Sequence, residues 1–180
     1  MKTKVIIIRG PSGVGKSSVS RLLVDKIGQK IKRLAYLPVD VSIHPFMKNY
    51  SNLPRKERGD IMQENIELIF DNFLKRKFTI IVEGGFHRKH NNETAMGRLM
   101  KIAKKHKMGV TVIELHAPLE ILYKRVEKRK KENAYAWNNP KETEERYHRF
   151  MKSRHKEAIV IETENKSPEK IVHEILNRIK

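Results

Sequence analysis

The sequence predicts an α/β protein, a three-layer α/β/α sandwich around a parallel five-stranded sheet. Short, nearly continuous apolar runs recur along the chain, as is typical of strands buried on both faces. Longer segments with apolar residues at helical spacing separate these runs. A glycine-rich turn joins the first run to the first helix. Because strands and helices alternate, parallel strands with right-handed crossovers are favoured.

The predicted elements follow in the order βαβαβαβα(α)βα. Strands are expected at 3–9, 33–39, 78–82, 110–116 and 158–162. Helices are expected from the glycine-rich turn to about residue 29, and at 54–76, 94–107, 118–131, 141–156 and 168–179. Local signals support these limits: Pro118 suits the first turn of a helix, Gly109 follows a helix end, and Ser167 caps the last helix.

Length and composition limit the class of protein. The 180 residues suffice for one core, and we expect a single domain over 1–180. The chain has no cysteine, which excludes disulfides, thiolate nucleophiles and cysteine-based zinc sites. No apolar run approaches the roughly 20 residues that cross a bilayer, and the first residues lead directly into a strand without a signal-peptide pattern. We therefore expect a cytoplasmic protein with no membrane partner.

The chain is strongly basic. Lys and Arg total 39 against 21 Asp and Glu, which gives a net charge of +18. Phosphorylated ligands and nucleic acids are natural partners of such a surface. A lysine-rich composition without a function is the alternative interpretation of the same charge.

Residues 10–18, GPSGVGKSS, form the clearest motif, G-x-x-x-x-G-K-S between a buried strand and a helix. Glycines let the backbone wrap closely around phosphates because they lack a Cβ, and the N–H groups that open the helix then bind the anion. Lys16 can reach the β- and γ-phosphates, and the Ser17 hydroxyl can ligate Mg²⁺. The expected nucleotide-binding residues are Gly10, Ser12, Gly13, Val14, Gly15, Lys16, Ser17 and Ser18.

Two carboxylates stand where predicted strands end. Asp40 follows the strand 33–39, and Glu83 closes the strand 78–82. Carboxyl ends of parallel strands share one edge of the sheet, where ligands bind. We expect Asp40 to accept the proton of an acceptor hydroxyl, and Glu83 to hold Mg²⁺ together with Ser17. A turn aspartate and a strand-end cap are the alternatives.

A basic segment follows the fourth predicted strand. Arg125 and Arg129 lie four residues apart on the helix 118–131 and so share a face. The break NAYAWNNP, residues 133–140, comes next, followed by another charged helix. This pattern predicts a helical lid over about 126–146 that excludes water and brings both arginines to the γ-phosphate. A solvated basic helix is the alternative.

These motifs together resemble the P-loop kinase and phosphotransferase superfamily. The similarity covers nearly the whole chain and is greatest to the compact branch with gluconate and shikimate kinases, chloramphenicol phosphotransferase, zeta-type toxins and polynucleotide kinases. Residues 10–18 resemble its Walker A loop, and PVD at 38–40 resembles the strand end with its acceptor-side aspartate. IIVEGGF at 80–86 is similar to its third-strand motif, and 115–129 looks like its lid entry, whose arginine maps onto Arg125. The resemblance implies a P-loop NTPase fold with a helical lid and the cofactors ATP and Mg²⁺.

The chain differs from the motifs of other P-loop proteins, and these differences limit the reactions that we expect. The third strand ends in the single Glu83 instead of an Asp-Glu pair, which argues against motor-type ATPase chemistry. The run Asn165-Lys166-Ser167-Pro168 lacks the final aspartate of a guanine-binding motif. The run Gly85-Phe86-His87-Arg88 partly resembles the Gly-Phe-Pro-Arg of nucleoside monophosphate kinases.

We therefore expect a kinase that moves the γ-phosphoryl group of ATP to a hydroxyl acceptor of small-metabolite or nucleoside type. The acceptor is expected between Asp40, residues 41–60 and residues 85–93. Three alternatives stay open. The charge of +18 favours a 5′-hydroxyl kinase of RNA or DNA; the others are a nucleoside monophosphate kinase and an ATP-dependent binding or switch module without transfer. The sequence makes no prediction of oligomeric state.

Overall fold

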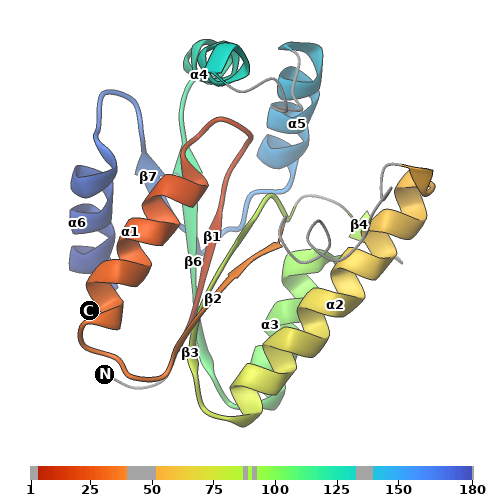
Figure 1. Cartoon of the computed structure of the whole chain (residues 1–180), viewed down its shortest axis with the longest axis vertical. Helices are drawn as coiled ribbons and strands as arrows, with labels where there is room; N and C mark the ends of the chain where they lie inside the picture. Colours follow the sequence, from red (N-terminus) through yellow and green to blue (C-terminus); the bar gives the residue numbers. More distant parts are fainter. Residues whose placement is uncertain (1–3, 40–51, 87–88, 91–92, 133–139, 180) are drawn as a thin grey trace.

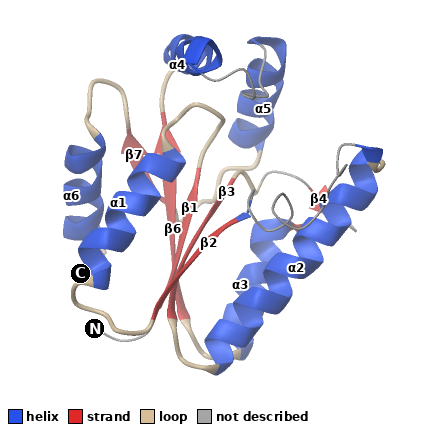
Figure 2. Ribbon diagram, in the orientation of Figure 1, coloured by secondary structure: helices blue, strands red, loops and turns tan. Residues whose placement is uncertain are grey.

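Each predicted strand forms part of one parallel sheet in the computed structural model (Figure 1, Figure 2). The structure describes residues 4–39, 52–86, 89–90, 93–132 and 140–179. The five strands are β1 (Lys4–Arg9), β2 (Leu34–Pro38), β3 (Thr79–Gly84), β6 (Gly109–His116) and β7 (Ile159–Glu162). Their order in the sheet is β2-β3-β1-β6-β7, and all neighbours are parallel.

Helices cover both faces of this sheet, which explains why its central strands are apolar on both sides. In β1, Ile6 and Ile8 face one hydrophobic core, and Val5 and Ile7 face the other. The first core is closed by α1 (Lys16–Gly28) and α6 (Pro168–Arg178). The second is closed by α2 (Arg55–Lys75) and α3 (Ala95–Lys105). The predicted three-layer sandwich is confirmed.

Two further helices, α4 (Leu119–Glu132) and α5 (Pro140–Lys152), stand at the carboxyl end of the strands (Figure 1). They contain the described parts of the predicted lid, 126–132 and 140–146, whereas 133–139 lie outside the described residues. The structure adds a two-stranded antiparallel sheet, β4 (Lys89–His90) with β5 (Glu93–Thr94), where the sequence predicts no strand. Strands of two residues are too short to leave a periodic pattern.

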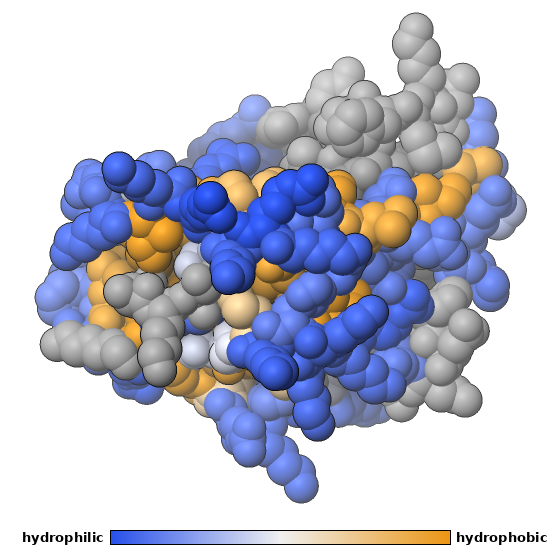
Figure 3. Space-filling view, turned by 90° about the horizontal axis from the view of Figure 1, so that it is seen from below, coloured by the Kyte–Doolittle hydropathy of each residue, from blue (hydrophilic) through white to orange (hydrophobic). Residues whose placement is uncertain are grey.

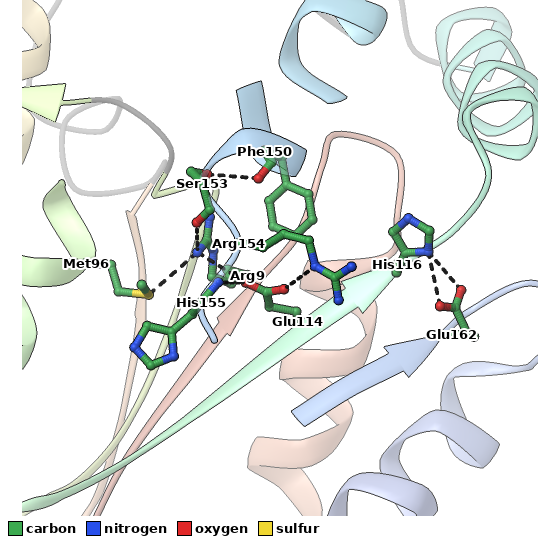
Figure 4. A network of polar contacts seen from close by, with 9 residues as sticks. All are labelled: Arg9, Met96, Glu114, His116, Phe150, Ser153, Arg154, His155 and Glu162. Atoms are coloured by element: carbon green, nitrogen blue, oxygen red, sulfur yellow. Dashed lines mark hydrogen bonds and ion pairs between the residues drawn. The ribbon is translucent and has the colours of Figure 1, made fainter. Parts of the chain in front are cut away.

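One helix ends earlier than predicted. The expected helix over 141–156 is α5, which ends at Lys152. The chain leaves the helix there because its next residues bind buried charges on the sheet. The Ser153 carbonyl accepts a hydrogen bond from Arg9 at 2.7 Å, and the His155 N–H donates one to Glu114 at 2.8 Å (Figure 4). Helical periodicity continues in the sequence, but these long-range contacts end the helix.

The face of the molecule at which the strands begin is mainly polar. Figure 3 looks onto this face and shows hydrophilic residues over most of it, with hydrophobic residues in the gaps between them. Within the described residues, no helix combines the length and the apolar character that a membrane crossing requires.

Packing against the second core predicts the effect of truncating α2. Ile66 is buried there, whereas Leu68, two residues on, is 70% exposed. We expect Ile66→Ala to lower the free energy of unfolding by about 2 to 5 kcal/mol, because it leaves a cavity in the core. The matched variant Leu68→Ala removes the same number of carbons from the surface and should change it by less than about 0.5 kcal/mol. Denaturant unfolding measures both, and equal losses would contradict the assigned core.

Candidate functional site

The glycine-rich loop leaves β1 in a very narrow space. A Cβ added to Gly10 would lie 2.6 Å from the backbone oxygen of Leu115 on β6, so no larger residue fits without moving the strand. Gly15 adopts a φ of +97°, a backbone conformation that residues with a side chain rarely adopt. The helix α4 packs on the same loop, since a Cβ at Gly13 would lie 2.9 Å from Val126 Cγ2. Glycine at these three positions therefore allows the loop to follow a tight path against β6 and α4.

The helix α1 begins at Lys16, directly after this loop. Its N-cap residue, Gly15, provides no side-chain hydrogen bond to the first turn. The N–H groups at a helix start carry partial positive charge and lack helical partners. Ser17 and Ser18 in this turn are exposed, which leaves the first turn open to a ligand. Uncapped amides next to a glycine-rich loop form a typical phosphate-binding arrangement.

The side chain of Lys16 lies back against the loop. Its Nζ donates a hydrogen bond to the Pro11 carbonyl at 3.0 Å. This contact holds the ammonium group beside the loop backbone, where its charge adds to that of the amides. The expected role of Lys16 at the β- and γ-phosphates stays a prediction.

Glu83 connects the loop to the neighbouring strand end. The Ser17 hydroxyl donates to Glu83 Oε1 at 2.7 Å, and the Tyr36 hydroxyl donates to Glu83 Oε2 at 3.0 Å. Only 5% of the surface of Glu83 is exposed. Burial raises the pKa of the Tyr36 phenol, and the adjacent Glu83 carboxylate raises it further, so the phenol stays protonated and remains a donor. The two hydroxyls thus hold the carboxylate in one orientation.

The oxygen atoms of Ser17 and Glu83 suit a hard divalent cation. Magnesium takes oxygen ligands, usually one or two from the protein, and completes its shell with water and phosphate oxygens. The described part of the chain contains no group of three or more His, Asp and Glu side chains that could hold a metal by itself. A hydroxyl and one carboxylate beside a phosphate loop fit Mg²⁺ bound with a nucleotide.

Arg125 joins α4 to two loops at this edge. It donates to the side-chain and backbone oxygens of Thr163 at 3.0 and 2.8 Å, and to the Val14 carbonyl at 3.4 Å. Thr163 itself is fully buried. The residue before it, Glu162, pairs with His116 at 2.9 Å across the ends of β7 and β6 (Figure 4). The guanidinium of Arg125 is therefore fixed between the glycine-rich loop and the turn after β7.

The structure does not connect the other predicted site residues, Arg129 and Asp40, to this group of side chains. Arg129 lies one turn beyond Arg125 and is exposed, and it shares no hydrogen bond or ion pair with another described residue. Asp40 lies outside the described residues, so its expected role as a base stays a prediction. Residues 87–88, part of the segment 85–93 expected beside the acceptor, also lie outside the described residues.

Sequence reasoning missed Tyr36 and Thr163. Tyr36 is a polar interruption in the apolar run RLAYLPV, and its register partner on β3 is Ile81, two residues before Glu83. Only the strand order places its hydroxyl on Glu83. Thr163 directly follows β7, at the carboxyl-end edge of the sheet. That position was the available signal, but its arginine partner lies 38 residues away in the chain.

Comparison with known proteins assigns the family. A family model described as "AAA domain" matches residues 5–158. The chain belongs to this family. A shikimate kinase from Persephonella marina is 30% identical over 176 residues, which cover 97% of this chain and 98% of that protein. The chain is thus a member of the P-loop kinase superfamily and an ATP-dependent phosphotransferase, which decides against a switch module without transfer.

Solved structures share the fold of this AAA-domain kinase. A gluconokinase from Sinorhizobium meliloti 1021 aligns with a TM-score of 0.65 and 16% identity over 97% of this chain and 90% of that one. The APS kinase of Mycobacterium tuberculosis, in complex with AMPPNP and APS, aligns with a TM-score of 0.68 and 17% identity over 99% and 98%. These similarities confirm the parallel five-stranded sheet with helices on both sides.

The narrow space at Gly10 predicts a specific loss. We expect Gly10→Ala to lower the free energy of unfolding by about 1 to 3 kcal/mol, because the added methyl group overlaps the Leu115 carbonyl and displaces the loop. Affinity for ATP, measured by calorimetry, should fall with it.

The control is Gly59→Ala in α2, where an added Cβ meets no atom within 4 Å. This variant should raise the free energy of unfolding by about 0.4 to 1 kcal/mol and leave ATP affinity unchanged. Equal ATP affinity in the two variants would contradict the proposed packing of the loop.

Proposed function

We propose that this phosphotransferase moves the γ-phosphoryl group of ATP to a hydroxyl group of a small metabolite at the carboxyl-end edge of the sheet. The contact between Ser17 and Glu83, beside Lys16 and an uncapped helix start, is the observation that carries the proposal. It brings a cation, a hydroxyl and a buried carboxylate together at the start of α1. Phosphoryl transfer depends mainly on such positioning and charge neutralisation.

The glycine-rich loop binds the phosphates of ATP in this proposal. The backbone amides of residues 13–18 donate to phosphate oxygens, and Lys16 exchanges its contact with Pro11 for the β- and γ-phosphates. Gly10, Ser12 and Val14 shape the loop around them. The exposed first turn of α1 supports this assignment, because the side-chain bond to Glu83 is the one that the described residues make with Ser17 and Ser18.

Ser17 and Glu83 would hold Mg²⁺. When bound, the ion neutralises phosphate charge and orients the transferring group. The chain's own contribution is to keep the two oxygen donors in place, and Tyr36 does so by holding Glu83 from its other oxygen. Such outer contacts commonly orient metal ligands.

Arg125 supplies positive charge from the lid side. Its bonds to Thr163 and Val14 place the guanidinium between the loop and the turn after β7, where it would stabilise the charge that develops on the phosphoryl group. Arg129 is proposed as a second arginine that approaches once the acceptor is bound, as its exposure on α4 permits.

Asp40 is the proposed base for the acceptor hydroxyl. The last residue of β2, Pro38, pairs in register with Glu83, so the chain leaves β2 at the level of the metal carboxylate. Asp40 follows two residues later in the sequence. A carboxylate in this part of the chain supports proton acceptance from an alcohol within reach of the phosphates.

The acceptor class is inferred from the related kinases. The 30% identical relative is named for shikimate, and a structure with the same fold for gluconate; both acceptors are hydroxylated carboxylic acids. An anionic acceptor also suits a chain with a net charge of +18. The same charge favours a second candidate acceptor, the 5′-hydroxyl end of RNA, whose binding would weaken steeply with salt.

The test is transfer of γ-labelled phosphate from Mg-ATP to separate acceptors: shikimate, gluconate, APS, a nucleoside monophosphate and a short 5′-hydroxyl RNA. Label on a small hydroxylated acid supports the proposal. Label on RNA alone, lost at high salt, replaces it with the second candidate. Absence of label on every hydroxyl acceptor, with label on a nucleoside monophosphate instead, contradicts both.

Replacing the loop lysine should abolish this transfer. We expect Lys16→Ala to lower the transfer rate by at least about 100-fold, because it removes the positive charge beside the β- and γ-phosphates. The matched control is Lys26→Ala in the last turn of the same helix, which is exposed and should behave as wild type. Undiminished turnover in the Lys16 variant would remove the proposed site.

Glu83 gives a separate test of the metal role. Glu83→Gln keeps one side-chain oxygen as an acceptor, places an amide N–H toward the other hydroxyl and removes the charge. The Mg²⁺ concentration for half-maximal activity should therefore rise at least about tenfold. The Mg²⁺ dependence of thermal stabilisation by AMPPNP should shift in parallel, which reads binding without turnover. Glu162→Gln, at the end of β7 and more than half exposed, is the control that leaves both unchanged. An identical Mg²⁺ requirement in both variants would exclude Glu83 as a ligand.

A further inference from the structure

A buried pair of opposite charges lies directly beneath the glycine-rich loop. Arg9 is the last residue of β1 and precedes Gly10, and its register partner on β6 is Glu114. Arg9 has no exposed surface and Glu114 has 1%. The guanidinium and the carboxylate are 3.2 Å apart. Charged residues at the centre of an apolar sheet are costly to bury and call for specific partners.

Those partners come from the segment that follows α5 (Figure 4). Arg9 donates to the Ser153 carbonyl at 2.7 Å and to the Ser153 hydroxyl at 2.8 Å. Glu114 accepts from the His155 N–H at 2.8 Å and from Arg154 Nε at 3.1 Å. Each member of the pair thus binds both the other and the chain that leaves α5.

The side chains around Arg9 close the site on two more sides. The ring of Phe150 on α5 lies 4.9 Å from the guanidinium carbon. The sulfur of Met96 on α3 lies 4.0 Å from Arg9 Nη1. Phe150 is fully buried and Met96 nearly so. The planar guanidinium therefore joins the end of β1 to α3, α5 and β6, a role that an ammonium group cannot fill equally well.

We propose that Arg9 is a positioning residue for phosphoryl transfer, because it fixes the end of α5 to the strand end from which the phosphate loop starts. This rests on the proposed function for the reaction that it serves. The other helix of the pair, α4, is already tied to the loop through Arg125 and Val126. α4 and α5 also contact each other, with the Tyr123 hydroxyl 3.2 Å from Glu144. Arg9 supplies the second attachment, so that both helices keep a fixed position relative to the loop.

Removal of the guanidinium tests this role. Arg9→Met keeps an apolar side chain in the core, and Arg154 still pairs with Glu114. We expect kcat for ATP turnover to fall about tenfold or more, because small displacements in a transfer site are costly, while KM for ATP changes less than about threefold. Both constants are expressed per folded molecule, with the folded fraction taken from thermal unfolding. Arg9→Lys keeps the charge but not the two-pronged contact with Ser153, and should recover stability more fully than kcat.

A second measurement needs no activity. Trypsin cleaves after Lys152, Arg154 and Lys156, in the segment that Arg9 holds. Cleavage there should be at least about tenfold faster in Arg9→Met than in wild type under conditions where both are folded. The control is Arg178→Met on α6, which removes an arginine from a half-exposed ion pair with Glu174 and should alter neither measurement.

The results of these measurements distinguish failure of the proposed role of Arg9 from failure of the proposed phosphoryl transfer. Lower kcat with near-constant KM and faster cleavage at 152–156 supports positioning by Arg9. Wild-type kcat per folded molecule, or wild-type cleavage at 152–156, overturns it, since a merely structural role changes only the folded fraction. If Arg9→Met does not fold, Arg9→Lys replaces it, and a kcat and a cleavage rate per folded molecule equal to wild type there overturn the proposal. Absence of transfer to any acceptor in wild type refutes the proposed function, while the cleavage assay still decides whether Arg9 holds the segment.

Discussion

The parallel register of β1 with both of its neighbours is the constraint on which the site depends. In that register Arg9 lies level with Gly84 on β3 and with Glu114 on β6. β1 and β3 therefore end at the same level, whereas β6 continues to His116. The loop that leaves β1 enters a space bounded by β6 on one side and by Glu83 on the other. The contact between Ser17 and Glu83 spans 66 residues of sequence, yet it requires only that two adjacent parallel strands stop at the same level. The register of the sheet therefore brings these side chains together at its carboxyl-end edge.

Burial and charge act together at the same edge. The sheet ends in three charged side chains that are almost fully buried: Arg9, Glu83 and Glu114. Each has specific partners, Glu83 with two hydroxyls and the other two with each other and with the segment after α5. Buried charged groups cost free energy where a polar atom lacks a partner, and of these side chains Arg9 leaves its Nε without one. Their presence directly below and beside the phosphate loop is consistent with a site whose parts must hold one geometry.

The sequence predicts local features of this protein better than its long-range ones. The loop from Gly10 to Ser18 is a contiguous motif, and the strand before it and the helix after it follow from short-range periodicity. Glu83 is predictable because it closes an apolar run. The sequence predicts only that Arg9 and Glu114 lie in strands, because no local pattern indicates that two residues 105 positions apart form an ion pair. The same pair ends α5 at Lys152, four residues before the predicted limit. Tyr36 was missed because its hydroxyl reaches Glu83 only once β2 is known to lie beside β3.

A crystal structure with AMPPNP and Mn²⁺ would show whether this strand edge binds both the phosphates and the metal, because the anomalous signal of manganese locates the metal independently of the nucleotide. We predict that the phosphates lie on the amides of residues 13–18 and that one manganese peak lies within coordination distance of the Ser17 hydroxyl, on the side of Glu83. A nucleotide bound away from the loop, or a manganese peak remote from Ser17 and Glu83, would contradict the assignment of this strand edge as the phosphoryl-transfer site.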